Sequence, residues 1–390
     1  MSSLTQFIAV SGMNFRNLPQ RVGTSLVVVI GVAGVVAVLI SVLAMATGFS
    51  HTVASTARND RVLIFRGGSQ SELSSSLSRR AAAVIADSPG IRVENNQPLA
   101  SPEAIVMVNV PKKGDKNGAN VALRGVNPVA FAVRPEIKLI SGRMFQPGLD
   151  ELIVGTAAQI QFQGLEVGKK IAIRGTEWTI VGNFTSAGDS HESEMLADVE
   201  AVITAYRREG FQAVTALVDD FTKLKDTLTS NPELGIEVVR EPDYYRDQSR
   251  QVDAILYFVA YVVGGIMAIG AIFAALNTMY AAVSARTLEI ATLRAIGFGP
   301  LPIVASILCE SMLLAVLGGL LGVAVAWSVF NGSAVSTLGG NFTQIVFPIS
   351  VDPPVMITGL VWAAVVGLIG GVFPAIRAAR LPVAAALQGQ

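Results

Sequence analysis

The residue types that usually bind metal ions are few in this chain and far apart. The 390-residue sequence holds two histidines, His51 and His191, and one cysteine, Cys309. A zinc site takes three or four ligands, mostly from these residue types, so we expect no metal site. His191 lies in the acidic segment 189–194. A weak cation site is one interpretation of this segment, and a solvated acidic loop is the favoured one.

The sequence also lacks the motifs of nucleotide hydrolysis and nucleophilic catalysis. The stretch nearest to a phosphate-binding loop, residues 164–170, has neither the required spacing nor the Ser or Thr that binds Mg²⁺. No G-x-S-x-G elbow or paired-carboxylate arrangement stands out. We therefore expect a chain that is not an enzyme by itself and that has no catalytic or cofactor-binding residue.

Glu310 is an ionisable residue inside an otherwise apolar stretch, and such a residue is a functional-site hypothesis by default. It pairs with a basic or polar group near the membrane interface, or it transmits motion. A proton relay is a weaker alternative, since no second acid lies within a span. Four glycines at small-xxx-small spacing predict close helix packing: Gly318, Gly322, Gly367 and Gly371.

Residues 286–297 form the most informative segment. Ile290, Leu293 and Ile296 recur at three-residue spacing, which predicts a short amphipathic helix ended by Gly297. One interpretation is an interfacial helix lying on lipid. The other is a helix that docks into a groove on a cytoplasmic partner. The predicted docking residues are Arg286, Glu289, Ile290, Leu293, Arg294 and Ile296.

The elements that position these residues follow from the distribution of charge. Hydrophobic residues make up 51% of the chain and charged residues only 15%, against about 25% charged residues in soluble domains. The formal net charge is zero, so we expect no nucleic-acid partner. Of the 58 charged residues, 49 (23 basic and 26 acidic) lie in 51–253. The stretches 22–50, 254–285, 305–330 and 355–376 each reach the ~20 residues that a transmembrane helix needs.

Basic residues in the short segments predict the orientation in the membrane. The leader 1–21, the connection 286–304 and the tail 377–390 each carry two arginines, whereas the loop 331–354 carries no basic residue. We therefore expect an inner-membrane, multi-pass protein with both termini cytoplasmic and an amphipathic leader on the lipid surface. The first apolar run has about 29 residues and is too long for the ~7–15-residue core of a cleaved signal peptide.

The segment 51–253 is predicted to be a periplasmic α+β domain inserted between the first and second transmembrane helices. Strand–helix–strand order appears twice, which suggests one lobe, 58–126 and 214–242, split by a strand-rich insertion at about 127–213. Residues 72–86 are predicted to be a helix. Residues 243–285 are predicted to be one long helix, in which a polar stalk continues into the second span and joins membrane and domain rigidly.

Several segments resemble the MacB/FtsX-type permeases of ABC transporters, a family that includes the LolC/LolE proteins. Residues 286–297 resemble the family's coupling helix, Glu310 with 311–322 its third span, and 374–383 its C-terminal signature. Residues 140–145, 167–171 and 178–182 are similar to its MacB-like periplasmic core domain. The resemblance covers essentially the whole chain. The tail departs from it, since 384–388 replaces the usual Glu-Ala-Leu-Arg run.

The resemblance implies a dimer with a second permease, either the same or a related chain, and cytoplasmic ABC ATPase subunits that bind ATP and Mg on a separate chain. It implies mechanotransmission to the periplasmic domain and efflux or extraction of an amphiphilic or hydrophobic substrate. A periplasmic adaptor and an outer-membrane duct are further expected partners. The alternative is an FtsX-like, non-transporting signal relay that controls a periplasmic cell-wall hydrolase.

Labelling of single cysteines tests the predicted orientation. In a background where Cys309 is replaced by Ser, cysteines introduced in 51–253 should react with an impermeant maleimide added to intact cells from the periplasmic side. Cysteines in 286–296 should react only after the cells are opened. Reaction of both sets from the same side would contradict the assignment.

Overall fold

The computed structural model describes residues 6–8, 10–13, 22–114, 118–231, 234–338 and 343–381. Arg16 and Arg21 of the leader and residues 382–390 of the tail lie outside this part of the chain. The chain divides into two compact units. We call Met1–Thr47, Ile255–Ser333 and Ile349–Gln390 the helical unit, and Gly48–Ala254 with Ala334–Pro348 the α/β unit.

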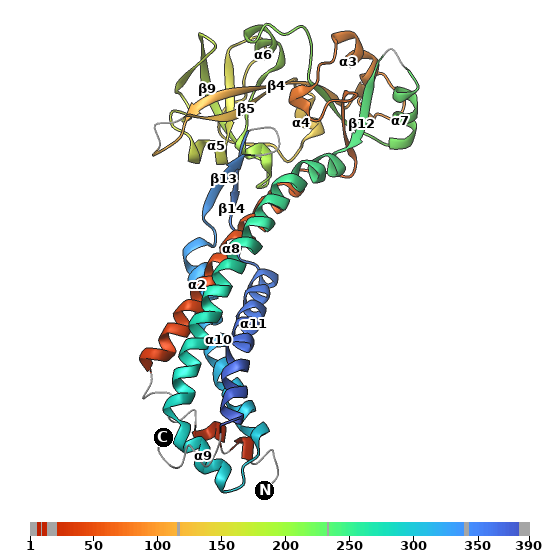
Figure 1. The fold of residues 1–390 in the computed structure, drawn as a ribbon. Coiled ribbons are helices and arrows are strands. Elements are labelled where there is room, and N and C mark those ends of the chain that lie inside the picture. The colour runs from red at the N-terminus through yellow and green to blue at the C-terminus, as the bar shows by residue number, and fades with distance from the viewer. Residues whose placement is uncertain are drawn as a thin grey trace. The chain divides into compact units, whose positions relative to one another are not determined.

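Four helices in the described residues are long and apolar enough to cross a membrane (Figure 1). They are α2 (Val22–Ser55), α8 (Glu241–Ala285), α10 (Pro300–Phe330) and α11 (Pro353–Ala379). The long stalk helix predicted from residue 243 onward is the 45-residue α8. Both α10 and α11 begin with proline, which lacks only an N–H that has no partner in the first turn.

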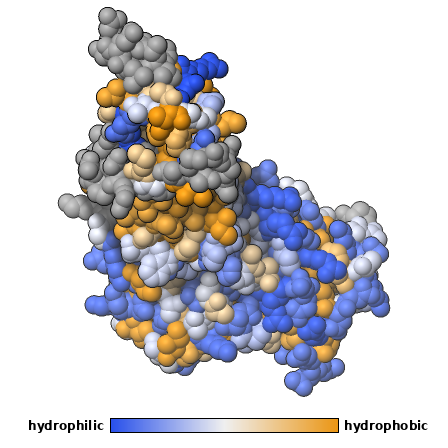
Figure 2. Space-filling model, turned by 90° about the horizontal axis from the view of Figure 1, so that it is seen from below, coloured by the Kyte–Doolittle hydropathy of each residue, from blue (hydrophilic) through white to orange (hydrophobic). Residues whose placement is uncertain are grey.

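Exposed large hydrophobic side chains are concentrated on these helices. Phe258, Ile266 and Phe273 of α8 and Trp327 of α10 are each more than half exposed. Hydrophobic and hydrophilic surface are also separated in the space-filling view, where one region is mainly orange and another mainly blue (Figure 2). A soluble protein rarely exposes large contiguous apolar patches, so this surface fits helices that cross a membrane.

A short helix, α9 (Thr287–Ala295), connects α8 to α10. It is the helix predicted within 286–297, and it ends before Gly297, whose φ is +99°. Residues 6–8 and 10–13 of the leader are also helical, with Val10 buried. The side-chain oxygen of Gln6 accepts a hydrogen bond from the backbone N–H of Gly299 (3.1 Å), so the leader contacts the α9–α10 connection.

The α/β unit is built on a ten-stranded mixed sheet with the order β12-β1-β11-β4-β5-β10-β7-β9-β6, and β8 also pairs with β9. Its strands are β1 (Arg61–Arg66), β4 (Ala100–Pro111), β5 (Gly118–Val126), β6 (Lys138–Gly142), β7 (Glu151–Gly155), β8 (Lys170–Ile173), β9 (Thr176–Thr185), β10 (Met195–Asp198), β11 (Ala213–Leu217) and β12 (Ile236–Arg240). The helices are η2 (Glu72–Ser74), α3 (Arg79–Ala86), α4 (Ala130–Val133), α5 (Thr156–Gln161), η3 (Ser190–Ser193), α6 (Val199–Ala205) and α7 (Phe221–Thr229). A separate two-stranded pair joins β2 (Val93–Glu94) and β3 (Gln97–Pro98).

The predicted division into a lobe and an insertion at residues 126/127 differs from the pairing of the strands. The first part of β4, up to Glu103, pairs with β11, and from Ala104 onward β4 pairs with β5. β5 pairs in turn with β10 of the predicted insertion. The two halves therefore share one strand, and the change of partner falls inside β4.

The predicted helix 72–86 is also two elements. The 3-10 helix η2 ends at Ser74, and α3 begins only at Arg79. The Ser78 side chain accepts a hydrogen bond from the N–H of Ala81 and caps α3. Serine favours such caps over helix interiors because its hydroxyl competes for backbone hydrogen bonds, which explains the break in this serine-rich stretch.

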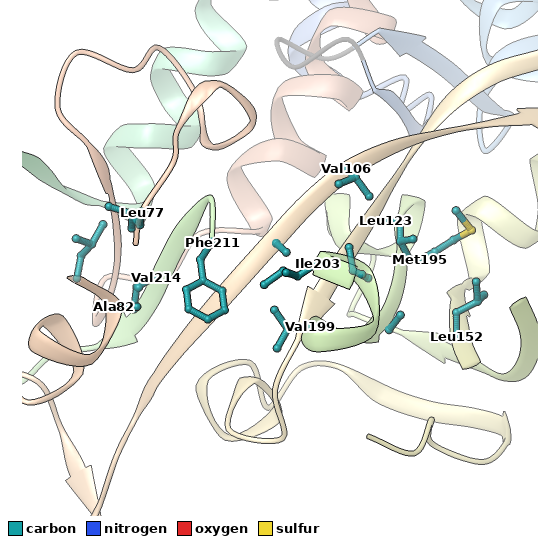
Figure 3. Close-up of a cluster of buried hydrophobic side chains, with 14 of the residues drawn as sticks. Leu77, Ala82, Val106, Leu123, Leu152, Met195, Val199, Ile203, Phe211 and Val214 are labelled. Atoms are coloured by element: carbon teal, nitrogen blue, oxygen red, sulfur yellow. The ribbon is translucent and has the colours of Figure 1, made fainter. Parts of the chain in front are cut away.

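One hydrophobic core extends along the sheet, on both sides of the point in β4 where the pairing changes from β11 to β5. Leu77, Ala82 and Val214 line one side of the long β4 strand in the close-up view, and Leu123 and Met195 line the other (Figure 3). All of them belong to the same buried cluster. The unit therefore has a continuous core, as expected of a single domain.

The loop 331–354 contains a β-hairpin that the sequence interpretation missed. Strands β13 (Ala334–Leu338) and β14 (Gln344–Pro348) pair antiparallel and belong to the α/β unit. The Phe347 ring packs edge-on against Phe49 of α2, with 5.6 Å between ring centroids. Gly48 touches the same strand, since a Cβ on it would collide with the Pro348 carbonyl oxygen and lie 3.3 Å from the Phe347 ring.

Replacement of Gly48 by alanine should therefore destabilise the protein. Overpacking of this kind costs about 1–3 kcal/mol. Gly31→Ala on the same helix is the matched control, because nothing lies within 4 Å of its Cβ position and alanine is favoured over glycine in helices by roughly 1 kcal/mol. Thermal unfolding of the full chain in detergent should show a lower midpoint for Gly48→Ala than for Gly31→Ala. Equal midpoints would contradict the contact.

Candidate functional site

The short helix α9 is held at its N-terminal end by a buried ion pair. Arg286, the residue before α9, places Nη1 3.1 Å from Oε2 of Glu310 on α10, and both side chains are over 90% buried. Of the interpretations of Glu310, pairing with a basic group is therefore the arrangement in the structure. A charge placed in this environment needs such a partner, since an isolated buried charge is strongly unfavourable.

A second arginine holds the C-terminal end of α9. Arg294 donates from Nη1 to the carbonyl oxygen of Ala379 at 2.6 Å and to that of Leu381 at 3.3 Å, at the end of α11. The last carbonyls of a helix have no partner within the helix and carry partial negative charge. The guanidinium group of Arg294 supplies these carbonyls with a hydrogen-bond donor and with a positive charge.

The middle of α9 packs into a hydrophobic cluster of the helical unit. Ile290 is buried among Met279 and Val283 of α8, Ile303 and Ile307 of α10, and Ala375 and Ala378 of α11. The side chains of α9 that remain exposed are those of Leu288, Glu289, Thr292 and Ala295, and Ile296 follows directly after the helix. Leu288 is 61% and Ile296 69% exposed.

The six predicted docking residues differ in how accessible they are. Arg286 and Ile290 are buried, and Leu293 and Arg294 are partly buried, so only Glu289 and Ile296 of the six lie on the exposed side. Of the three apolar residues at three-residue spacing, Ile290 is buried and Leu293 partly buried, whereas Ile296 is exposed. The side that carries Ile290 packs against the protein's own helices, because a short helix gains stability mainly from tertiary packing. Leu288 is the exposed apolar residue that the pattern missed.

The four glycines predicted to pack helices all lie at close approaches in the helical unit. A Cβ on Gly318 would lie 2.7 Å from the Val29 carbonyl oxygen of α2, and one on Gly322 equally close to that of Ala33. Gly367 and Gly371 of α11 face α10, where Gly371 would meet the Ser311 side chain at 2.7 Å. Small residues at such positions let helix backbones approach each other.

In the α/β unit, one carboxylate joins the end of α2 to the start of α8. Oε2 of Glu241, the first residue of α8, accepts from Arg61 Nε at 2.5 Å and from the Arg58 backbone N–H at 2.9 Å. Arg61 also donates to the carbonyl oxygen of Thr56, directly after α2, at 2.7 Å. Arg61 and Glu241 are both fully buried, so this ion pair fixes where the two helices meet within the unit.

A second buried network surrounds Arg124 of β5. Its guanidinium contacts three carboxylates: Glu103 of β4 at 2.7 Å, Glu194 at 2.8 Å and Glu72 of η2 at 3.3 Å. Glu103 also pairs with Arg134. The network therefore links strands β4 and β5 with the short helix η2 and the segment after η3.

The pKa values of the carboxylates in this network are shifted in opposite directions. Burial would raise the pKa of Glu103, but the charges of Arg134 and Arg124 outweigh burial and lower the pKa to about 2. Burial would likewise raise the pKa of Glu194, but Arg124 and His191 lower it well below its usual range. For Glu72 burial prevails and the pKa is raised, in keeping with its longer contacts to Arg124.

The acidic segment around His191 is not the solvated loop that the sequence predicted. It forms η3, in which Ser190, His191 and Ser193 are buried. His191 Nδ1 lies 3.1 Å from Glu194 Oε2, and Asp189 accepts from the His191 backbone N–H at 2.8 Å. Composition suggested a hydrated loop, but each carboxylate of the segment has a donor inside the fold, which offsets part of the cost of burying it.

Hydrogen bonds connect the hairpin to η3 and to neighbouring elements of the α/β unit. The Ser193 hydroxyl accepts from the Val346 backbone N–H at 2.9 Å. The Ser336 hydroxyl accepts from Lys112 Nζ at 3.1 Å and from Gln161 Nε2 at 2.5 Å. A small cavity beside the Ser193 contact is lined by Glu72, Arg124 and Glu194, by Tyr245 of α8 and by residues 343–345. The hairpin, the charge network and α8 therefore meet at one place in the unit.

Comparison with known families agrees with this architecture. The family model described as MacB-like periplasmic core domain matches residues 22–230, which is more than half of the chain. The model described as FtsX-like permease C-terminal matches residues 261–383. The chain belongs to the MacB/FtsX-type permease family.

Two curated relatives have the name macrolide export ATP-binding/permease protein MacB. The protein from Psychrobacter cryohalolentis is 27% identical over 165 residues, which is 40% of this chain and 23% of the relative. The one from Nitrobacter winogradskyi is 26% identical over 261 residues, which is 61% of this chain and 38% of the relative. The chain thus spans well under half the length of these relatives.

Among solved structures, the fold resembles the periplasmic region of MacB from Actinobacillus actinomycetemcomitans. The TM-score is 0.38 at 14% sequence identity, and the match covers 50% of this chain and 95% of that structure.

The opposite pKa shifts of Glu103 and Glu72 predict opposite effects of neutral substitutions. Glu103→Gln leaves Arg134 without its carboxylate and should cost about 3–5 kcal/mol at neutral pH. Because the pKa of Glu103 is lowered, its stabilisation is complete above the ordinary value of 4.5 and is lost as the pH falls toward 2. The deficit of the variant should therefore shrink below about pH 4.5.

Glu72→Gln is the matched variant, because Glu72 and Glu103 both contact the guanidinium of Arg124. Because the pKa of Glu72 is raised, its ionised form disfavours folding at neutral pH, so glutamine should stabilise the protein there. That advantage should vanish as the pH falls toward 4.5. Midpoints of thermal unfolding of the full chain between about pH 2 and pH 8 provide the measurement, and shifts of the same sign at pH 7 would contradict the assignment.

Proposed function

We propose that this chain is the permease subunit of an ABC transporter that relays the ATP-driven motion of a separate ATPase to its α/β unit. Membership of the MacB/FtsX-type family supports the permease role. The observation that carries the proposal is the exposed side of α9, where Leu288, Glu289 and Ile296 stand clear of the protein's own packing.

The docking face of this proposal consists of Leu288, Glu289, Thr292, Ala295 and Ile296. Two large apolar side chains beside one carboxylate suit a hydrophobic groove with a basic rim. The ATPase would bind ATP and Mg on the cytoplasmic side of the inner membrane, where both termini of this chain would also lie. The α/β unit would then be periplasmic.

The substrate of the proposed transporter is amphiphilic or hydrophobic and is exported or extracted from the membrane. The relatives are named for macrolide export, and that name favours export here over the signal-relay alternative. A second permease, an adaptor in the periplasm and an outer-membrane duct complete the proposed assembly. The match to the FtsX-like permease C-terminal model keeps control of a cell-wall hydrolase as the second candidate.

Purification of the tagged full chain from its native membranes tests this function. An ABC ATPase should co-purify, and the chain stripped of it should hydrolyse no ATP above background. Leu288→Asp and Glu289→Lys should each reduce the recovered ATPase at least fivefold. Ile160→Asp is the matched control, since Ile160 is 65% exposed but lies on α5 of the α/β unit.

Two outcomes would contradict the proposal or redirect it. Full recovery of the ATPase with Leu288→Asp would remove the docking face. Co-purification of a cell-wall hydrolase in place of an adaptor would favour the signal relay over export.

A further inference from the structure

The arginines at the two ends of α9 bind two different helices. Arg286 pairs with Glu310, which lies about three turns into α10, and 3.1 Å separate Nη1 from Oε2. Arg294 bonds to the carbonyl oxygens of Ala379 and Leu381 at the end of α11.

The two attachments differ in chemistry but act on the same short helix. The Arg286–Glu310 pair is largely closed off from solvent, so separating the two charges in this poorly solvating environment is unfavourable. The Arg294 bonds satisfy carbonyl groups that α11 cannot satisfy itself. Between them, Ile290 packs against α8, α10 and α11. These nine residues are therefore fixed at both ends and in the middle.

The exposed residues of α9 lie on the opposite side from these attachments. Leu288 and Ile296 are exposed, whereas Arg286 and Ile290 are buried and Arg294 is partly buried. A load applied to the exposed side therefore reaches α10 through Glu310 and α11 through the Ala379 carbonyl. One side of α9 is therefore available to a partner, and the opposite side contacts the other helices of the helical unit.

We propose that the Arg286–Glu310 pair and the Arg294 bonds to the end of α11 form a two-point clamp, whose residues are positioning residues that make α9 move as one body with α10 and α11. This inference rests on the proposed function, since α9 must first receive the ATPase. Glu310 then transmits motion in addition to neutralising Arg286. A merely structural pair would lower the amount of folded protein but leave its response to ATP unchanged.

The test measures how far the α/β unit responds to ATP in the intact complex with its ATPase. The probe is a non-hydrolysable ATP analogue added to the complex in detergent, and the readout is the change in amide hydrogen exchange across Gly48–Ala254. Two further measurements accompany it: the amount of ATPase that co-purifies, and the basal rate of ATP hydrolysis. This design needs no knowledge of the substrate.

Four variants distinguish loss of the clamp from a general loss of folded protein. Glu310→Gln removes one charge of the buried pair, and Arg294→Gln removes the donor to α11. Arg294→Lys retains a donor and should restore part of the response. Arg377→Gln is the matched control, because Arg377 lies in the last turn of α11 but stacks on Tyr280 of α8 and makes no bond to α9.

Glu310→Gln and Arg294→Gln should reduce the exchange change at least fivefold while the ATPase still co-purifies. Arg294→Lys should recover at least half of the loss, and Arg377→Gln should remain within twofold of the natural chain. If Glu310→Gln fails to accumulate in membranes, the comparison of Arg294→Gln with Arg294→Lys decides.

An exchange change within twofold of the natural chain in Arg294→Gln, with the ATPase bound, would overturn the clamp and leave the proposed function standing. Failure of the natural chain to recover any ATPase would instead overturn the proposed function, and the clamp with it. The two failures are therefore distinguishable.

Discussion

The pairing of buried charge is the constraint on which the rest of this structure depends. Arg61, Arg124, Arg134 and Arg286 are each at least 95% buried, and each has a carboxylate partner. Removing either partner of such a pair is strongly unfavourable, because the remaining ion is poorly solvated. The geometry around each arginine is therefore tightly determined, whatever the net contribution of the pair to stability.

These pairs lie where segments distant in sequence have to meet. Arg61 and Glu241 are 180 residues apart and join the end of α2 to the start of α8. Arg124 joins two strands to η2 and to the segment after η3. In the helical unit, Arg286 joins α9 to α10, and glycines allow the longer helices to pack closely. The motion relay proposed for this chain would need junctions of this kind, because soft contacts would absorb the movement.

The sequence was sufficient for features that depend on local composition and insufficient for those that depend on tertiary contacts. Hydropathy alone predicted four apolar helices and the long α8, because these depend on runs of neighbouring residues. The side of α9 that remains exposed depends on α8, α10 and α11, and the spacing of Ile290 and Leu293 carries no information about them. The burial of His191 depends in the same way on Glu194 and on the fold around η3.

The hairpin is a different case, because its signal was present in the sequence. Residues 334–338 and 344–348 are rich in β-branched and aromatic side chains, which favour strands. The absence of basic residues in the loop 331–354 indicates membrane orientation and says nothing of the hairpin. Its role in the α/β unit could not be inferred, since Ser193 and Phe49, its partners, lie more than 140 residues away along the chain.

The position of the hairpin in the chain has a consequence for the order of synthesis. The ribosome completes Gly48–Ala254 first and must then add residues 255–333, that is 79 residues, before the hairpin emerges. At roughly 5–20 residues per second this interval lasts about 4–16 s. Throughout it the Phe49 ring and the Ser193 hydroxyl lack the partners that the hairpin supplies. The nascent α/β unit must therefore persist for seconds in an incomplete form while two further helices are being made or inserted.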